Sequence, residues 1–159
     1  GPGKKSRHTI IPGFLMKDGK AVGPFGVMGG FMQPQGHVQV IMNTLDFMMN
    51  PQETLDAPRW QWVGGKKIQV EKTFPAEIVE ELKRRGHEME VLESSLTFGR
   101  GQIIWRDENG VLCGATEPRA DGAVAVWEYS TLPRKSEWEN TVKSSFLFKV
   151  IVVNSKLSR

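Results

Sequence analysis

The stretch that decides the fold is residues 27–37, Val27-Met28-Gly29-Gly30-Phe31-Met32-Gln33-Pro34-Gln35-Gly36-His37. Before the double glycine, residues 21–28 are apolar but interrupted by glycine and proline, which predicts an irregular β-strand. Pro34 is expected to mark a break, followed by a helix from about residue 36 to residue 49. Apolar side chains recur in this helix at spacings of three and four, so we expect it to be largely buried. Its apolar face comprises Val38, Ile41, Met42, Leu45, Met48 and Met49.

The flanking segments predict a hairpin and two further helices. Residues 9–16 form the first strand of a hairpin that turns at Asp18-Gly19. Asn50-Pro51-Gln52-Glu53 predicts a capped helix start, and that helix must end just before Pro58. Another helix is expected over residues 75–85.

The remaining body predicts strands that are grouped in hairpins. Gly64-Gly65 and Asn109-Gly110 are the two turn signals. The strands span residues 60–63, 68–71, 89–92, 101–105 and 111–115. Because hairpins and helices both occur, the predicted class is α+β with an antiparallel sheet.

Composition and charge indicate which classes of partner, such as nucleic acid or a membrane, are not expected. The net charge of +3 comes from residues 127–159, whereas residues 1–126 carry 15 basic and 15 acidic side chains. The basic clusters are short and accompany no recognition motif, so we expect no nucleic-acid partner. No apolar run reaches the length of a membrane span, so no membrane partner is expected. The sequence does not define a compartment.

Residues 127–159 differ from the body. All 17 glycines precede them, so we treat residues 1–126 as one unit and residues 127–159 as an atypical tail. Residues 146–153 are apolar enough to form a strand, which would be prone to aggregation if its edge were exposed. We assign no function to this tail.

The titratable residues predict no metal site and no cofactor. Cys113, His37 and His87 do not show metal-ligand spacing. We interpret Cys113 as a small buried hydrophobe, His37 as a core residue with a satisfied hydrogen bond, and His87 as solvated. Four charged residues are expected to form structural pairs at the loops: Asp56, Arg59, Arg119 and Asp121.

Three stretches together resemble a known family: residues 27–37, residues 43–60 with Asn50-Pro51-Gln52-Glu53 and Ala57-Pro58-Arg59-Trp60, and residues 114–122. Their order and spacing resemble the C-terminal part of the small subunit of γ-glutamyltransferases, which include glutathione hydrolases and acylase-like relatives. The resemblance implies an N-terminal-nucleophile (Ntn) hydrolase with a four-layer αββα sandwich. This chain would hold an incomplete part of it, an antiparallel sheet with helices on one face.

The resemblance also implies a mechanism. The family's precursor cleaves itself before a Thr, whose hydroxyl then attacks the γ-glutamyl carbonyl while its free α-amino group acts as the base. No nucleophile is expected in this chain, because that Thr would lie upstream of Gly1. The expected partners are therefore the large subunit and the N-terminal part of the small subunit. The chain alone is expected to be inactive.

The resemblance assigns site residues by position. Gly29 and Gly30 match the glycine pair whose N–H groups form the oxyanion hole, although such a pair is otherwise a common turn. His8 and Thr9 lie where the family has a serine pair that binds the substrate carboxylate; alternatively, His8 is a surface residue. Gln33 and Gln35 are candidates for hydrogen bonding the substrate, or else for capping the helix after Pro34.

Two functions stay open at this point. The first is an enzyme fragment that takes part in hydrolysis or transfer of γ-glutamyl or related acyl amides. The second is a non-catalytic binding or self-assembly module that associates through exposed sheet edges.

Overall fold

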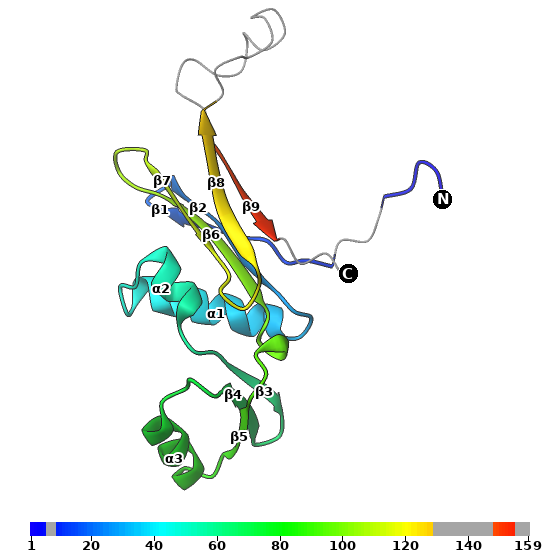
Figure 1. Cartoon of the computed structure of the whole chain (residues 1–159), viewed down its shortest axis with the longest axis vertical. Coiled ribbons are helices and arrows are strands. Elements are labelled where there is room, and N and C mark those ends of the chain that lie inside the picture. The colour runs from blue at the N-terminus through cyan, green and yellow to red at the C-terminus, as the bar shows by residue number, and fades with distance from the viewer. Residues whose placement is uncertain (6–8, 129–147, 155–159) are drawn as a thin grey trace, which may run out of the picture.

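The computed structural model describes residues 1–5, 9–128 and 148–154. Its centre is a four-stranded antiparallel sheet in the order β1-β2-β6-β7 (Figure 1). The strands are β1 (Gly13–Lys17), β2 (Lys20–Met28), β6 (Arg100–Arg106) and β7 (Leu112–Thr116). The predicted hairpin turn at Asp18-Gly19 is confirmed, with φ values of 51° and 74°.

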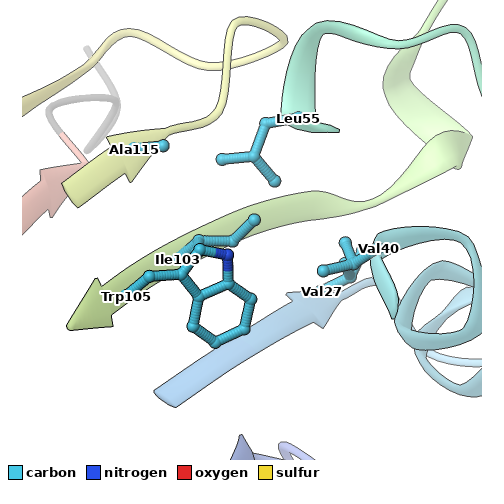
Figure 2. Packing of buried hydrophobic residues seen from close by; sticks show 6 residues of the cluster. All are labelled: Val27, Val40, Leu55, Ile103, Trp105 and Ala115. Atoms are coloured by element: carbon cyan, nitrogen blue, oxygen red, sulfur yellow. The ribbon is translucent and has the colours of Figure 1, made fainter. Parts of the chain in front are cut away.

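Two helices cover one face of this sheet, α1 (Met32–Leu45) and α2 (Pro51–Asp56). One residue from each helix, Val40 and Leu55, meets side chains from β2, β6 and β7 in the core. Figure 2 shows this cluster, which comprises Val27, Val40, Leu55, Ile103, Trp105 and Ala115. We call this the covered face.

Helix α1 differs from the prediction at its start and in its buried side. It begins at Met32 rather than at Gly36, because Pro34 lies in the first turn, where its missing N–H is not needed. The residues predicted to be buried are largely exposed, for example Val38 at 52% and Leu45 at 51%. The helix instead packs through Gly36, where an added Cβ would lie 2.7 Å from Val27.

The predicted helix start at Asn50 is confirmed. The Asn50 side chain accepts hydrogen bonds from the N–H groups of Gln52 and Glu53, and the Glu53 carboxylate accepts one from the Asn50 N–H. These reciprocal bonds satisfy N–H groups that the first turn leaves without partners. The short helix ends at Asp56, before Pro58.

A smaller sheet in the order β3-β4-β5 is separate from the first and lies beyond α1 and α2 (Figure 1). Its elements are β3 (Trp60–Gly64), β4 (Lys67–Glu71), α3 (Ala76–Arg84) and β5 (Glu88–Leu92). The β3–β4 hairpin is as predicted, but β4 and β5 pair in parallel rather than antiparallel. The crossover through α3 provides the connection that parallel neighbours require.

The last described strands are β8 (Gly122–Glu128) and β9 (Phe148–Asn154), which pair antiparallel and lie beside β7. A strand near residues 146–153 is thus confirmed from residue 148 onward; residues 146 and 147 lie outside the described part. The expected boundary after residue 126 falls inside β8 and stays a prediction.

Two interpretations of single residues are wrong. Cys113 is exposed, because it lies outside the buried core cluster, which takes Ala115 from β7. The His37 ring meets the Phe25 ring edge-on, with 5.3 Å between the ring centroids, but its buried Nε2 has no hydrogen-bond partner among the described residues.

No helix in the described ranges is long and apolar enough to cross a membrane.

Candidate active site

Gly29 and Gly30 form an exposed turn between β2 and α1, which we call the glycine turn. Their carbonyl groups accept hydrogen bonds from the N–H groups of Met32 and Gln33, both at 3.1 Å. Neither N–H group of the glycine turn donates a hydrogen bond to another described residue. The two carbonyl groups thus form the turn hydrogen bonds that lead into α1. The two N–H groups are available to donate to an acceptor outside the described residues.

Backbone geometry explains why glycine occupies this turn. Gly29 and Gly30 have φ values of 140° and 59°, which favour glycine. A Cβ at Gly29 would also lie 3.0 Å from the Cα of Gly99, and a Cβ at Gly99 would lie 2.5 Å from the Met28 carbonyl oxygen. Two backbone segments therefore meet here in direct contact. Gly99 was not predicted as a site residue, and its place just before an apolar strand is the signal that could have identified it.

The N-terminus of α1 adds an electrostatic field that favours negative charge at the glycine turn. Phe31 at the N-cap position has no side-chain capping bond, and the first turn contains no acidic residue. The partial positive charge of the helix N-terminus is therefore not compensated by a carboxylate from the helix itself. An anion at the glycine turn would be stabilised by this charge.

Gln33 is brought together with Thr9. The Gln33 Oε1 accepts from the Ile11 N–H at 2.9 Å, and its Nε2 donates to the Thr9 carbonyl at 3.0 Å. Gln33 is only 6% exposed, whereas Thr9 is exposed. The Gln33 amide is thus bonded to backbone in this structure. His8 lies outside the described residues.

Gln35 faces β3. Its Oε1 accepts from the Trp62 N–H at 2.7 Å, and its Nε2 donates to the carbonyls of Trp62 and Phe31. Neither Gln33 nor Gln35 caps the helix, so that alternative is wrong. One turn later, Gln39 binds Trp60 in the same manner. Four residues of helix rise about 6.0 Å and two residues of strand rise about 6.6 Å, so the two periods match.

Four buried charges lie behind the glycine turn: Arg59, Glu71, Glu117 and Arg119. Arg59 pairs with Glu117 at 2.8 Å, Arg119 pairs with Glu117 at 2.7 Å, and Arg119 also binds Glu71. Every side chain in this group is at most 7% exposed. Burial lowers the pKa of Arg59, and this shift is opposed by the charge of Glu117.

This network confirms that Arg59 and Arg119 are structurally paired, but their partners are buried glutamates rather than loop aspartates. Arg59 also donates to the carbonyls of Phe98 and Gly99, at 3.0 Å and 3.3 Å. It therefore holds the segment against which Gly29 lies.

An open groove of about 440 Å³ lies on the other side of the sheet, which we call the open face. Part of its wall comes from Ile10, Pro12 and Gly13, and β2 and β6 contribute the rest. The lining is mainly apolar and comprises Ile10, Pro12, Gly13, Pro24, Phe25, Gly26, Met28, Arg100, Gln102, Ile103 and Ile104. Met28 places the groove next to the glycine turn.

The described residues contain no group of three or more His, Cys, Asp or Glu side chains that could hold a metal. Burial lowers the pKa of His37, which favours its neutral form. The described residues at this site include the N–H donors of the glycine turn, the exposed Thr9 and the buried Gln33 amide.

Comparison with known proteins gives a consistent result. The family model described as Gamma-glutamyltranspeptidase matches residues 1–127. The glutathione hydrolase-like YwrD proenzyme of Bacillus subtilis is 36% identical over 128 residues, which cover 77% of this chain and 24% of that protein. The oxamate amidohydrolase proenzyme of Klebsiella pneumoniae is 33% identical, with coverage of 78% and 25%. The chain thus spans about a quarter of the length of these curated relatives.

Solved structures agree with these relatives. Cephalosporin acylase from Bacillus halodurans superposes with a TM-score of 0.75 and 65% sequence identity, and the match covers 81% of this chain and 24% of that one. A γ-glutamyltranspeptidase from Pseudomonas nitroreducens has a TM-score of 0.63 at 24% identity, with coverage of 77% and 64%. The second similarity shows the shared fold. The relatives are named as hydrolases, amidohydrolases and acylases.

Proposed function

Because the chain belongs to the gamma-glutamyltranspeptidase family, we propose that it forms part of the catalytic sandwich of an acyl-amide hydrolase or acyltransferase. The observation that carries this proposal is the glycine turn. Its two N–H groups bond to no other described residue, and they lie at the start of a helix without a capping side chain.

In the proposed reaction, a hydroxyl nucleophile attacks the carbonyl carbon of the amide. The carbonyl oxygen gains negative charge, and the N–H groups of Gly29 and Gly30 donate hydrogen bonds to it. The free α-amino group of the nucleophilic residue takes the hydroxyl proton and passes it to the leaving amine as the C–N bond breaks. Water or a second amine takes the acyl group from the nucleophile. The nucleophile is a Thr in polypeptide that precedes these residues in the full-length protein.

The substrate is proposed to be γ-glutamyl or a related acyl amide. Thr9 supplies a hydroxyl, and its exposed position leaves that group accessible. Gln33 links Thr9 to the glycine turn, which supports a common site. His8 and Gln35 remain candidates for contacts with the substrate.

The open face supports the proposal that the rest of the sandwich comes from other polypeptide. Phe14, Met16 and Met28 are 56%, 52% and 44% exposed. An apolar face of this kind indicates a surface that another part of a protein covers. The proposed partners are the large subunit and the N-terminal part of the small subunit.

The test compares the isolated 159 residues with the full-length protein on γ-glutamyl anilide and on other acyl anilides. We expect the full-length protein to release aniline with a burst from the acyl-enzyme, and the isolated chain to release none. Turnover by the isolated chain would overturn the assignment of the nucleophile. A full-length protein that cleaves no acyl amide would overturn the proposed function.

The exposed apolar side chains also favour a second candidate, a non-catalytic module that self-associates. Size-exclusion chromatography with and without residues 127–159 tests it. A monomer whose elution ignores those residues counts against this candidate.

A further inference from the structure

We propose that Gln33 is a positioning residue whose side-chain amide fixes the segment of residues 9–11 at a set distance from the glycine turn. The inference deepens the proposed function and rests on it. Gln33 is then not a group that touches the substrate. It holds together two elements that do.

Gln33 is bonded to both elements at once. Its backbone N–H donates to the carbonyl of Gly30 at 3.1 Å. Its side chain accepts from the Ile11 N–H at 2.9 Å and donates to the Thr9 carbonyl at 3.0 Å. The backbone of one residue thus binds the glycine turn, while the side chain binds the segment with the candidate hydroxyl. We call these two side-chain bonds the Gln33 bridge.

The chemistry of the bridge requires a carboxamide. In an extended segment, the carbonyl of residue 9 and the N–H of residue 11 point to the same side. A carboxamide offers one acceptor and one donor in a single plane, as a neighbouring peptide group would. Because Gln33 is only 6% exposed, its side-chain amide has little access to water and depends on these two backbone bonds.

The bridge also affects the groove on the open face. Ile10 and Pro12, which flank Ile11, both line that groove. Release of the Gln33 bridge would therefore loosen the wall of the groove together with Thr9. The expected consequence is weaker substrate binding rather than slower chemistry.

The chain contains a matched control in Gln39. It is 7% exposed, accepts from the Trp60 N–H at 3.2 Å and donates to the Trp60 carbonyl at 2.9 Å. Like Gln33, Gln39 is a buried glutamine on α1, but its partner, Trp60, lies on β3. Substitution of Gln39 therefore measures the contribution of a buried glutamine to stability, without an effect on the segment of residues 9–11.

The experiment uses Gln33→Met and Gln39→Met in the full-length protein that contains this chain. We measure KM and kcat on acyl anilides, the melting temperature, and hydrogen exchange at the Ile11 amide. We expect Gln33→Met to raise KM about tenfold, equivalent to 1.4 kcal/mol, with kcat changed less than about threefold. Exchange at Ile11 should become about tenfold faster. Gln39→Met should lower the melting temperature similarly and change neither KM nor Ile11 exchange.

Gln33→Glu provides a second variant in case Gln33→Met fails to fold. Glutamate keeps the acceptor for the Ile11 N–H but cannot donate to the Thr9 carbonyl when ionised. We expect a KM between those of the unmodified protein and Gln33→Met.

Faster exchange at Ile11 with an unchanged KM overturns the positioning role, and so does an equal rise of KM in Gln39→Met. If the unmodified protein cleaves no acyl amide, the proposed function itself fails. In that case, Ile11 exchange still decides whether Gln33 holds the segment.

Discussion

The two faces of the four-stranded sheet differ although the same strands build both. On the covered face, Val27, Ile103 and Ala115 are at most 1% exposed beneath α1 and α2. On the open face, Phe14 and Met28 are 56% and 44% exposed. Strands that alternate apolar and polar residues are built for one buried face, whereas continuous apolar runs are built for two. The first two strands therefore have the composition of a sheet covered on both sides, and this chain supplies one cover.

The largest expected effect is on stability and comes from breaking the charge network of Arg59, Glu71, Glu117 and Arg119. Arg59→Met removes the cation that pairs with Glu117 Oε2 and leaves the buried network one positive charge short, so it should lower the free energy of unfolding by about 3–5 kcal/mol. Arg100→Met is the matched change on the open face, where Arg100 donates to the Leu96 carbonyl near solvent. Its cost should stay within about 1 kcal/mol. Urea unfolding measures both, and equal losses would contradict the difference between the faces.

Core substitutions sharpen the same comparison. Ile103→Ala on the covered face should cost about 2–5 kcal/mol, because the cavity that it leaves is fully enclosed. Phe14→Ala on the open face removes more atoms but should change stability by only about 0.5 kcal/mol in the isolated chain. Thermal unfolding of both variants checks this. A larger loss from Phe14→Ala would show that the open face is already covered.

Association should depend on the open face. We expect the isolated chain to self-associate, and Phe14→Ser with Met28→Ser to raise the dissociation constant about tenfold. Sedimentation equilibrium measures the change. A double variant at two exposed polar residues, Gln52→Ala with Glu108→Ala, is the control, because it carries the same number of substitutions. An equal effect of that control would exclude the open face as the contact surface.

The smallest effect concerns His37. Burial lowers its pKa in the folded state below the ordinary value of 6.5, so the unfolded chain binds the proton more readily. The contribution of His37 to stability is therefore complete above pH 6.5 and declines as the pH falls below it. His37→Phe should flatten the pH dependence of unfolding between pH 7 and the onset of carboxylate protonation. An unchanged slope would contradict this.

The features that could be predicted from sequence are those set by neighbouring residues. The capping box at Asn50 and the turn at Asp18-Gly19 depend on side chains and φ preferences within four residues. The double glycine was also a local signal, since its backbone angles favour glycine.

The features that could not be predicted depend on distant partners. The buried side of α1 is set by its approach to Val27 through Gly36, and periodicity alone selected the wrong face. Arg59 pairs with Glu117 just after β7, and Arg119 pairs with Glu71 of β4; both contacts join residues that are far apart in the chain. The Gln33 bridge joins residues more than twenty positions apart, so spacing could identify Gln33 as a candidate but not its partner.

The most direct test of the central claim removes one N–H group from the glycine turn. In the full-length protein, Gly30 is replaced by glycolic acid, so that an ester oxygen takes the place of the N–H. The same replacement at Gly65, in the β3–β4 turn, is the control. We predict that the change at Gly30 lowers kcat by about 10²–10³, the usual cost of one oxyanion donor, and that the change at Gly65 has little effect. A kcat that is unchanged by the ester at Gly30 would contradict the account.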